Sequence, residues 1–213
     1  MGSGQQTPSY RFGLVRDWPG YFRSVEGKGP RETLVEAAGL VESDESAEHA
    51  FAIDLGCGEG RDTAELLRRG FRVLALDGHP QGIERVLART APDHAARLEA
   101  RVAAFETLEE LPPCDLLNAS FSLPFCPPDR FARVWELVTS SVRPGGVFAG
   151  QLFGDRHSWA SIPDRSHHTA QEARGLLRGF DLVRFDDEER DAEDFEGHAM
   201  HWHLFHVVAR RVE

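Results

Sequence analysis

The sequence predicts an α/β fold built on a mostly parallel sheet, and two observations carry this prediction. Apolar runs typical of strands alternate along the chain with segments whose apolar residues recur at helical spacing, an order typical of parallel sheets covered by helices. Residues 51–55 are almost wholly apolar and lead into a glycine-rich turn, as expected for a strand buried on both faces. The chain has 213 residues, which suits one domain with a substantial core.

The order of the predicted elements follows from the same patterns. Prolines open a helix at residue 127, and a capping box of Thr169 and Glu172 opens another. A long acidic loop, residues 186–197, is expected to join the last two strands. The expected helices cover residues 30–41, 61–70, 80–91, 127–142 and 169–177, and the expected strands cover residues 51–55, 71–77, 100–105, 115–120, 142–150, 180–185 and 202–210.

Charge and cysteine content limit the classes of partner and compartment. The net charge is −11, Lys28 is the only lysine, and the arginines form no basic stripe. Such a surface repels a phosphate backbone, so we expect no nucleic-acid partner. No apolar run reaches the length of a membrane span, so no membrane association is expected. The three cysteines form no CxxC pair, which indicates a reducing cytosol and therefore a cytoplasmic location.

The most informative motif is Asp-Leu-Gly-Cys-Gly-Glu-Gly at residues 54–60, between a predicted strand and a predicted helix. Glycines let the backbone approach a ligand closely, and the free N–H groups of a helix N-terminus point toward it. A dinucleotide-binding fingerprint requires its third glycine one position later, where Arg61 stands. The motif therefore indicates a ligand site and disfavours a dinucleotide-dependent oxidoreductase.

Three further motifs follow in order. The strand at residues 71–77 ends in Asp77, 23 positions after Asp54, where a carboxylate can accept hydrogen bonds from both hydroxyls of a ribose. Residues 115–120 form another strand whose end faces the same edge of the sheet. A Pro-Gly-Gly turn at residues 144–146 leads into the next strand.

Together these four motifs, over about residues 50–153, resemble those of class I S-adenosylmethionine-dependent methyltransferases. The resemblance implies a Rossmann-like fold with a seven-stranded, mostly parallel sheet and an antiparallel C-terminal strand. It also implies S-adenosylmethionine as the cofactor and S-adenosylhomocysteine as the product. The cofactor-binding residues that it implies are Asp54, Gly56, Gly58, Gly60, Arg61, Asp77, Phe105, Glu106 and Asn118.

Several of these residues have two interpretations. Asp54 would fix the glycine turn or meet the amino group of the cofactor. Arg61 would reach the cofactor carboxylate or stay exposed. Phe105 replaces the carboxylate that the family usually has directly after the third strand, and its ring would stack on the adenine or belong to the core.

The end of the predicted strand at residues 115–120, with the residues that follow it, indicates the class of methyl acceptor. Residues 118–125 differ from the Asn/Asp-Pro-Pro-Tyr/Phe signature of methyltransferases that act on amino groups of bases or glutamine. The run Leu-Pro-Phe-Cys-Pro-Pro at 123–128 is similar instead to small-molecule methyltransferases, including the tellurite-resistance type. We therefore expect methyl transfer to a small acceptor, at O, N, S or a soft metalloid such as tellurite. The alternative is a protein of the same fold that binds the cofactor without turnover.

The N-terminal segment and two loop residues are candidates for contact with the acceptor. Residues 1–9 are expected to be a disordered lead, residues 10–48 a helical lid, and residues 49–213 the methyltransferase domain, within one domain overall. Aromatic residues of the lid can attract a sulfonium and exclude water, or can simply pack on the sheet. Asp155 and His157 are candidates for a general base or for an exposed loop. The lid candidates are Tyr10, Trp18 and Tyr21.

Three histidines near the C-terminus suggest a metal site, but their spacing argues against one. On a strand, His201 and His203 share a face and His206 points to the other face. Three ligands cannot converge from one straight strand, so no metal is expected. The sequence identifies no catalytic residue, and it carries no signal for the oligomeric state.

Overall fold

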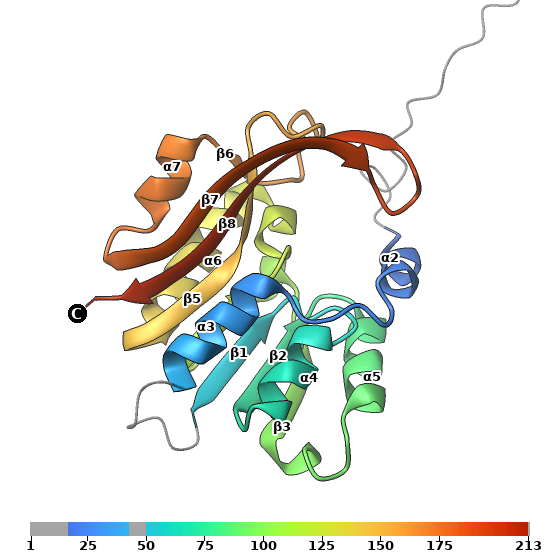
Figure 1. Ribbon diagram of the computed structural model, residues 1–213, viewed down its shortest axis with the longest axis vertical. Coiled ribbons are helices and arrows are strands. Elements are labelled where there is room, and N and C mark those ends of the chain that lie inside the picture. The colour runs from blue at the N-terminus through green and yellow to red at the C-terminus, as the bar shows by residue number, and fades with distance from the viewer. Residues whose placement is uncertain (1–16, 43–49, 213) are drawn as a thin grey trace, which may run out of the picture.

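The computed structural model describes residues 17–42 and 50–212 (Figure 1). The predicted lead at residues 1–9 and the lid candidate Tyr10 lie outside the described residues. The described strands form an eight-stranded sheet in the order β3-β2-β1-β4-β5-β8-β7, with the short β6 also paired to β5. The strands are β1 (Phe51–Leu55), β2 (Arg72–Asp77), β3 (Leu98–Val102), β4 (Cys114–Ala119), β5 (Val142–Gly154), β6 (His167–His168), β7 (Phe180–Glu193) and β8 (Ala199–Arg211).

The directions of the strands confirm the predicted fold class. The strands from β1 to β6 pair in parallel, whereas β8 runs antiparallel to both β5 and β7. The difference from the seven predicted strands is β6, a two-residue strand that pairs with the end of β5. The helices are α2 (Trp18–Ser24), α3 (Glu32–Glu42), α4 (Arg61–Arg68), α5 (Pro80–Arg89), α6 (Pro128–Ser141) and α7 (Ala170–Leu176).

Helices cover both faces of the sheet because side chains alternate along each buried strand. Ile53 and Leu55 of β1 belong to the core that also contains the apolar side of α6. Ala52, which directly precedes Ile53, belongs to a second core with the apolar sides of α3 and α4. Figure 1 shows α3 and α4 on the near side of the sheet. None of the described helices has the length and apolar character needed to cross a membrane.

Two predicted boundaries were wrong in informative ways. The third strand covers residues 98–102 rather than 100–105, so Phe105 lies in a short 3-10 turn beyond it. The acidic segment at residues 186–197 is mostly strand, because β7 continues to Glu193 and pairs with β8 along its whole length. In Figure 1 the resulting hairpin is long and curves over the edge of the sheet toward α2.

Candidate functional site

The glycine turn between β1 and α4 adopts a backbone that requires glycine. Gly56, Gly58 and Gly60 have φ angles of 77°, 56° and 86°, in the left-handed region that L side chains rarely adopt. A Cβ on Gly56 would lie 2.2 Å from the Cβ of Ser122, and a Cβ on Gly60 would lie 2.8 Å from a methyl group of Val86. The turn is therefore fixed both by backbone conformation and by close packing.

Asp77 ties this turn to the end of β2. One of its carboxylate oxygens accepts a hydrogen bond from the backbone N–H of Gly58 at 2.8 Å, and the other accepts one from the N–H of His79 at 2.7 Å. Burial raises the pKa of Asp77, and these two N–H groups oppose the rise. The carboxylate also lines the cavity above the turn, so each oxygen retains capacity to accept a further hydrogen bond there.

A second buried carboxylate, Asp54, lies at the end of β1. It accepts hydrogen bonds from the hydroxyl of Thr63 at 2.6 Å and from the amide of Asn118 at 2.8 Å. The same amide nitrogen lies 3.2 Å from a carboxylate oxygen of Asp62. Burial, followed by the nearby charge of Asp62, raises the pKa of Asp54 to about 7. The cluster places unneutralised acidic groups beside the cavity, where they favour a cationic group of a ligand.

These elements surround a cavity of about 360 Å³ at the carboxyl ends of β1, β2 and β4. This is the edge at which open parallel sheets bind ligands. Gly60 does not line the cavity, because it caps α4 against Val86. Asn118 is fully buried and lies behind Asp54 instead of facing the cavity. The predicted cofactor residues that line it are Asp54, Gly56, Gly58, Arg61, Asp77, Phe105 and Glu106.

Aromatic side chains from several segments line another side of this cavity. Trp18 and Tyr21, both predicted from the sequence, line it from α2. The ring of Trp18 meets that of Phe125 edge to face, with centroids 4.8 Å apart, and Tyr21 contacts Phe195 near the tip of the β7–β8 hairpin at 5.8 Å. Segments far apart in the sequence therefore form one aromatic wall. Its geometry suits the predicted lid.

The two candidates for a general base are not in the cavity. His157 is 2% exposed, its ring stacks on Phe153 with centroids 4.2 Å apart, and its Nδ1 accepts a hydrogen bond from the N–H of Trp159. Burial lowers the pKa of His157 to about 3, so it stays neutral at pH 7. Asp155 lies on the surface beside Arg156. The structure thus gives neither residue access to a bound ligand in the cavity.

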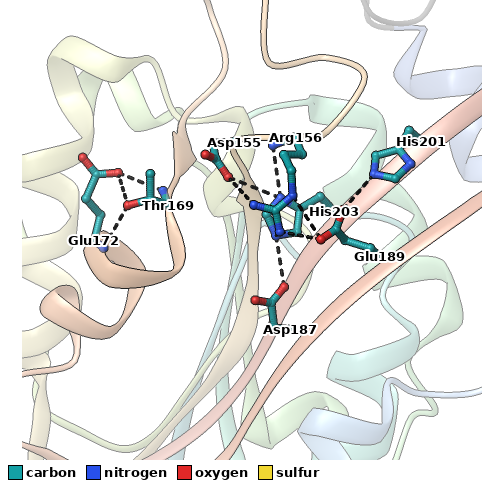
Figure 2. A network of polar contacts seen from close by, with 8 residues as sticks. All are labelled: Asp155, Arg156, Thr169, Glu172, Asp187, Glu189, His201 and His203. Atoms are coloured by element: carbon teal, nitrogen blue, oxygen red, sulfur yellow. Dashed lines mark hydrogen bonds and ion pairs between the residues drawn. The ribbon is translucent and has the colours of Figure 1, made fainter.

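The histidines of β8 belong to an ion-pair network with β7 (Figure 2). His203 contacts Asp187 at 3.0 Å, and His201 contacts Glu189 at 3.1 Å. The donor atoms of Asp187, Glu189 and His203 lie within 4.8 Å of one another, close enough to share a metal ion. Figure 2 shows the guanidinium of Arg156 against Glu189 and His203, so a cation already occupies this position. A second such group, Asp194, Glu196 and His198, lies at the hairpin tip.

The sequence reasoning missed several residues of the cavity. Phe22 is an aromatic residue of the predicted lid segment that was not among the lid candidates; it packs next to Gly58, and a Cβ on that glycine would lie 3.5 Å from its ring. His79 and Phe121 come two residues after the ends of β2 and β4, and that position was the available signal. The further missed residues are Leu55, Cys57, Glu59, Asp62, Gly78, Ala103, Ala104, Ser120, Ser122 and Phe125.

Comparison with known proteins agrees with this geometry. A family model described as a methyltransferase domain matches residues 52–146, which include the glycine turn and Asp77. The fold and the site thus resemble those of Rossmann-like S-adenosylmethionine-dependent methyltransferases. Over these residues the chain is similar to this class I family, as the motifs indicated. S-adenosylmethionine is the cofactor of that family.

Two curated relatives show how far the likeness extends. The carboxy-S-adenosyl-L-methionine synthase of Ectopseudomonas mendocina is 28% identical over 155 residues, covering 67% of this chain and 61% of the relative. The trans-aconitate 2-methyltransferase of an Enterobacter strain is 35% identical over 102 residues, covering 47% of this chain and 38% of the relative. The chain therefore spans less than two thirds of the length of either relative.

Solved structures share the fold. TehB from Haemophilus influenzae superposes with a TM-score of 0.68 at 14% identity, over 81% of this chain and 61% of that one. The 1,6-didemethyltoxoflavin-N1-methyltransferase of Burkholderia thailandensis, with 1,6-didemethyltoxoflavin and S-adenosylhomocysteine bound, superposes with a TM-score of 0.63 at 20% identity, over 100% of this chain and 94% of that one.

Proposed function

We propose that this protein transfers a methyl group from S-adenosylmethionine to a small-molecule acceptor. The observation that carries the proposal is the pairing of the glycine turn with Asp77 beneath one cavity with an aromatic wall. In this assignment Asp77 accepts the ribose hydroxyls, and the backbone of residues 56–60 lies against the ligand. Asp54 supports the turn and supplies negative charge for the amino group.

The residues of the site suit a reaction that needs position and dehydration more than acid–base chemistry. When bound, S-adenosylmethionine supplies a methyl group on a positively charged sulfur that is already a good leaving group. The protein must then hold the acceptor in line with that methyl group. Orientation of this kind lowers the activation barrier by about 7–11 kcal/mol. The two residues predicted as candidates for a general base, Asp155 and His157, do not line this cavity.

The aromatic residues of α2 have a role in this proposal as part of the lid, residues 10–48. Trp18 and Tyr21 would exclude water and attract the sulfonium charge with their ring faces. A ligand beneath α2 should then slow tryptic cleavage at the exposed Arg23, while cleavage at Arg178, remote from the cavity, stays unchanged. Equal cleavage at Arg23 with and without S-adenosylhomocysteine would mean that α2 only packs on the sheet.

A small acceptor is supported by the acidic surface and by the relatives. The net charge of −11 disfavours nucleic acid, and this also suits a cytoplasmic enzyme of small molecules. Trans-aconitate and 1,6-didemethyltoxoflavin, for which two of the similar proteins are named, are both small molecules. The rival functions are a protein that binds the cofactor without turnover and, with Arg61 in place of a third glycine, a dinucleotide oxidoreductase.

The test is formation of S-adenosylhomocysteine from S-adenosylmethionine across thiols, phenols, amines, carboxylic acids and tellurite. We expect turnover with one class, and we expect Asp77→Asn to reduce it more than Glu99→Gln, which changes an exposed carboxylate on β3. If S-adenosylhomocysteine binds but no acceptor yields it, the protein is a binder without methyl transfer. Mass analysis of the nucleoside product also separates methyl transfer from synthesis of carboxy-S-adenosylmethionine, the activity for which one relative is named.

A further inference from the structure

A second cavity, of about 500 Å³, adjoins the first one. It lies between the start of α3, the end of β4 and the β7–β8 hairpin. Arg61 and Phe121 line both cavities, so the two are neighbours that share one wall. Its other lining residues include several arginines and carboxylates, and it is therefore polar where the first cavity is partly aromatic.

Most charged groups of the second cavity already have partners. Arg184 contacts Asp186 at 2.6 Å, and Arg190 contacts Glu188 at 2.6 Å. The same Glu188 accepts a contact from His206 at 2.7 Å. These groups neutralise one another, so they offer no net charge to a ligand.

Arg31 is the exception among the described residues that line this cavity. Its guanidinium has no carboxylate within ion-pair distance among the described residues, and its buried Nε has no hydrogen-bond partner there. The nearest polar contact of the guanidinium is the hydroxyl of Tyr21, 3.5 Å from Nη2. Burial lowers the pKa of Arg31, and the nearby Tyr21 and Asp62 oppose this effect.

Neighbouring residues hold this guanidinium in place. The backbone N–H of Arg31 donates to Asp62 at 2.9 Å, and the guanidinium carbon lies 4.2 Å from the ring centroid of Phe121. Phe121 has a φ of 52°, which makes it the one non-glycine residue with a left-handed backbone in the described part of the chain. Its N–H donates to the buried side chain of Gln151 at 3.0 Å. Backbone strain of this kind gathers at ligand sites.

We propose that the second cavity receives the methyl acceptor and that Arg31 binds a carboxylate group of that acceptor. This inference rests on the proposed function, because it assigns the place of the acceptor in the same reaction. A fixed, planar guanidinium matches a carboxylate with two parallel hydrogen bonds. An anionic acceptor would supply the counter-charge that Arg31 lacks, and it would meet the cofactor where the two cavities adjoin, beside Phe121 and Arg61.

The cofactor also has a carboxylate, on its amino acid part, and Arg31 would bind it through the same two hydrogen bonds. The observations favour the acceptor, because Arg31 lines the second cavity and not the first, whereas Arg61 lines both. Arg61 is thus better placed for the cofactor. The two sources are separated by 5′-methylthioadenosine, which keeps the adenosine and the sulfur but lacks the amino acid carboxylate.

The experiment is calorimetry on the protein saturated with S-adenosylhomocysteine. Malonate, succinate and citrate serve as carboxylate probes, and malonamide serves as the uncharged counterpart of malonate. The variants are Arg31→Gln and Arg31→Lys, the second of which keeps the charge without the planar fork. The matched control is Arg174→Gln, since Arg174 also stacks on a phenylalanine ring, at 3.9 Å from the centroid of Phe185, but lines neither cavity.

We expect at least one carboxylate to bind and malonamide not to bind. Arg31→Gln should weaken the carboxylate at least about tenfold, Arg31→Lys less, and Arg174→Gln not at all, while the affinity for S-adenosylhomocysteine stays within about twofold. Absence of carboxylate binding to the wild-type complex, or equal binding to Arg31→Gln, would overturn the proposal. So would a loss of affinity in Arg31→Gln for S-adenosylhomocysteine but not for 5′-methylthioadenosine. Failure of the wild-type protein to bind S-adenosylhomocysteine would instead refute the proposed function itself.

Discussion

Carboxylates in two regions of the molecule are held in opposite ways. Beside the glycine turn, Asp54 and Asp77 are held by neutral donors, and burial raises the pKa of both. On the β7–β8 hairpin, Glu189 accepts hydrogen bonds from Arg156 and His201, which lower its pKa to about 2. Neither member of the first pair forms an ion pair with a cation among the described residues, whereas the hairpin carboxylate is already paired with protein cations.

This difference separates a site from a structural network. A buried acidic group with only neutral partners carries a desolvation cost that a cationic ligand can offset. An exposed ion pair contributes little to stability. Its charges are already paired with each other, so a charged ligand finds no unpaired partner there. The network of Figure 2 joins the end of β5 to the hairpin, and Gly154 lets the ring of His203 pack closely, since a Cβ there would lie 2.0 Å from Nδ1.

The largest effect is expected from a methyl group in the glycine turn. Gly56→Ala combines a left-handed φ of 77° with a Cβ position 2.2 Å from Ser122, whereas Gly70→Ala has a φ of 98° and open space. Backbone strain costs roughly 1–2 kcal/mol in both, and overpacking adds about 1–3 kcal/mol at Gly56 only. Urea unfolding measures the two losses. Equal losses would show that packing against Ser122 does not constrain the turn.

Asp77→Asn should have the next largest effect, on affinity for the cofactor. It removes a charged acceptor and replaces one oxygen with an N–H₂ group that faces a backbone donor. Hydrogen bonds to charged groups are worth about 1.5–3 kcal/mol, so the Kd for S-adenosylhomocysteine should rise roughly tenfold to a hundredfold. Calorimetry measures it, with Glu99→Gln on the neighbouring strand as the control. An unchanged Kd in a folded variant would contradict the ribose assignment.

A smaller effect concerns the pH dependence of stability. The pKa of Asp54 is about 7 in the folded protein, against an ordinary value of 3.8, so folding favours its protonated form. Its contribution to stability is full below about pH 3.8 and is lost as the pH rises toward 7. The free energy of unfolding of Asp54→Asn relative to the wild type should therefore increase between pH 4 and pH 7. A difference that stays constant over this range would contradict the assignment.

The smallest effect is expected for Glu189 on the hairpin. Its contribution to stability changes with pH in the opposite direction to that of Asp54. The pKa of Glu189 is lowered from 4.5 to about 2, so its contribution is present above pH 4.5 and is lost as the pH falls toward 2. Glu189→Gln should be slightly less stable than the wild type at pH 7, and the two should converge in acid. Affinity for S-adenosylhomocysteine should not change. A loss of that affinity would assign the network to the site.

The sequence predicted the cofactor half of the sheet more closely than the hairpin. The glycine turn and the strand that ends at Asp77 depend on local patterns, which are a backbone that requires glycine and an apolar run that ends in a carboxylate. The acidic segment of β7 has no such local signal. It is a strand because its backbone pairs with that of β8, in a register that places Glu189 opposite His203. Such cross-strand contacts depend on register and are not visible in a charge pattern.

Two site residues were misplaced for a related reason. Asn118 stands at the end of its strand as predicted, but its amide bridges two buried carboxylates beneath the cavity. His157 leaves β5 on the expected side, yet its ring packs on Phe153 within an aromatic cluster. Position along a strand was predictable in both cases. The direction of the side chain followed from partners distant in the sequence.

The central claim is that the glycine turn and Asp77 bind an S-adenosyl nucleoside. Calorimetry of the wild-type protein with S-adenosylhomocysteine and, separately, with NAD tests it most directly. The account predicts one S-adenosylhomocysteine site per chain, weakened roughly tenfold or more by Asp77→Asn, and no binding of NAD. Binding of NAD in the same cavity, or no binding of S-adenosylhomocysteine by a folded protein, would contradict it.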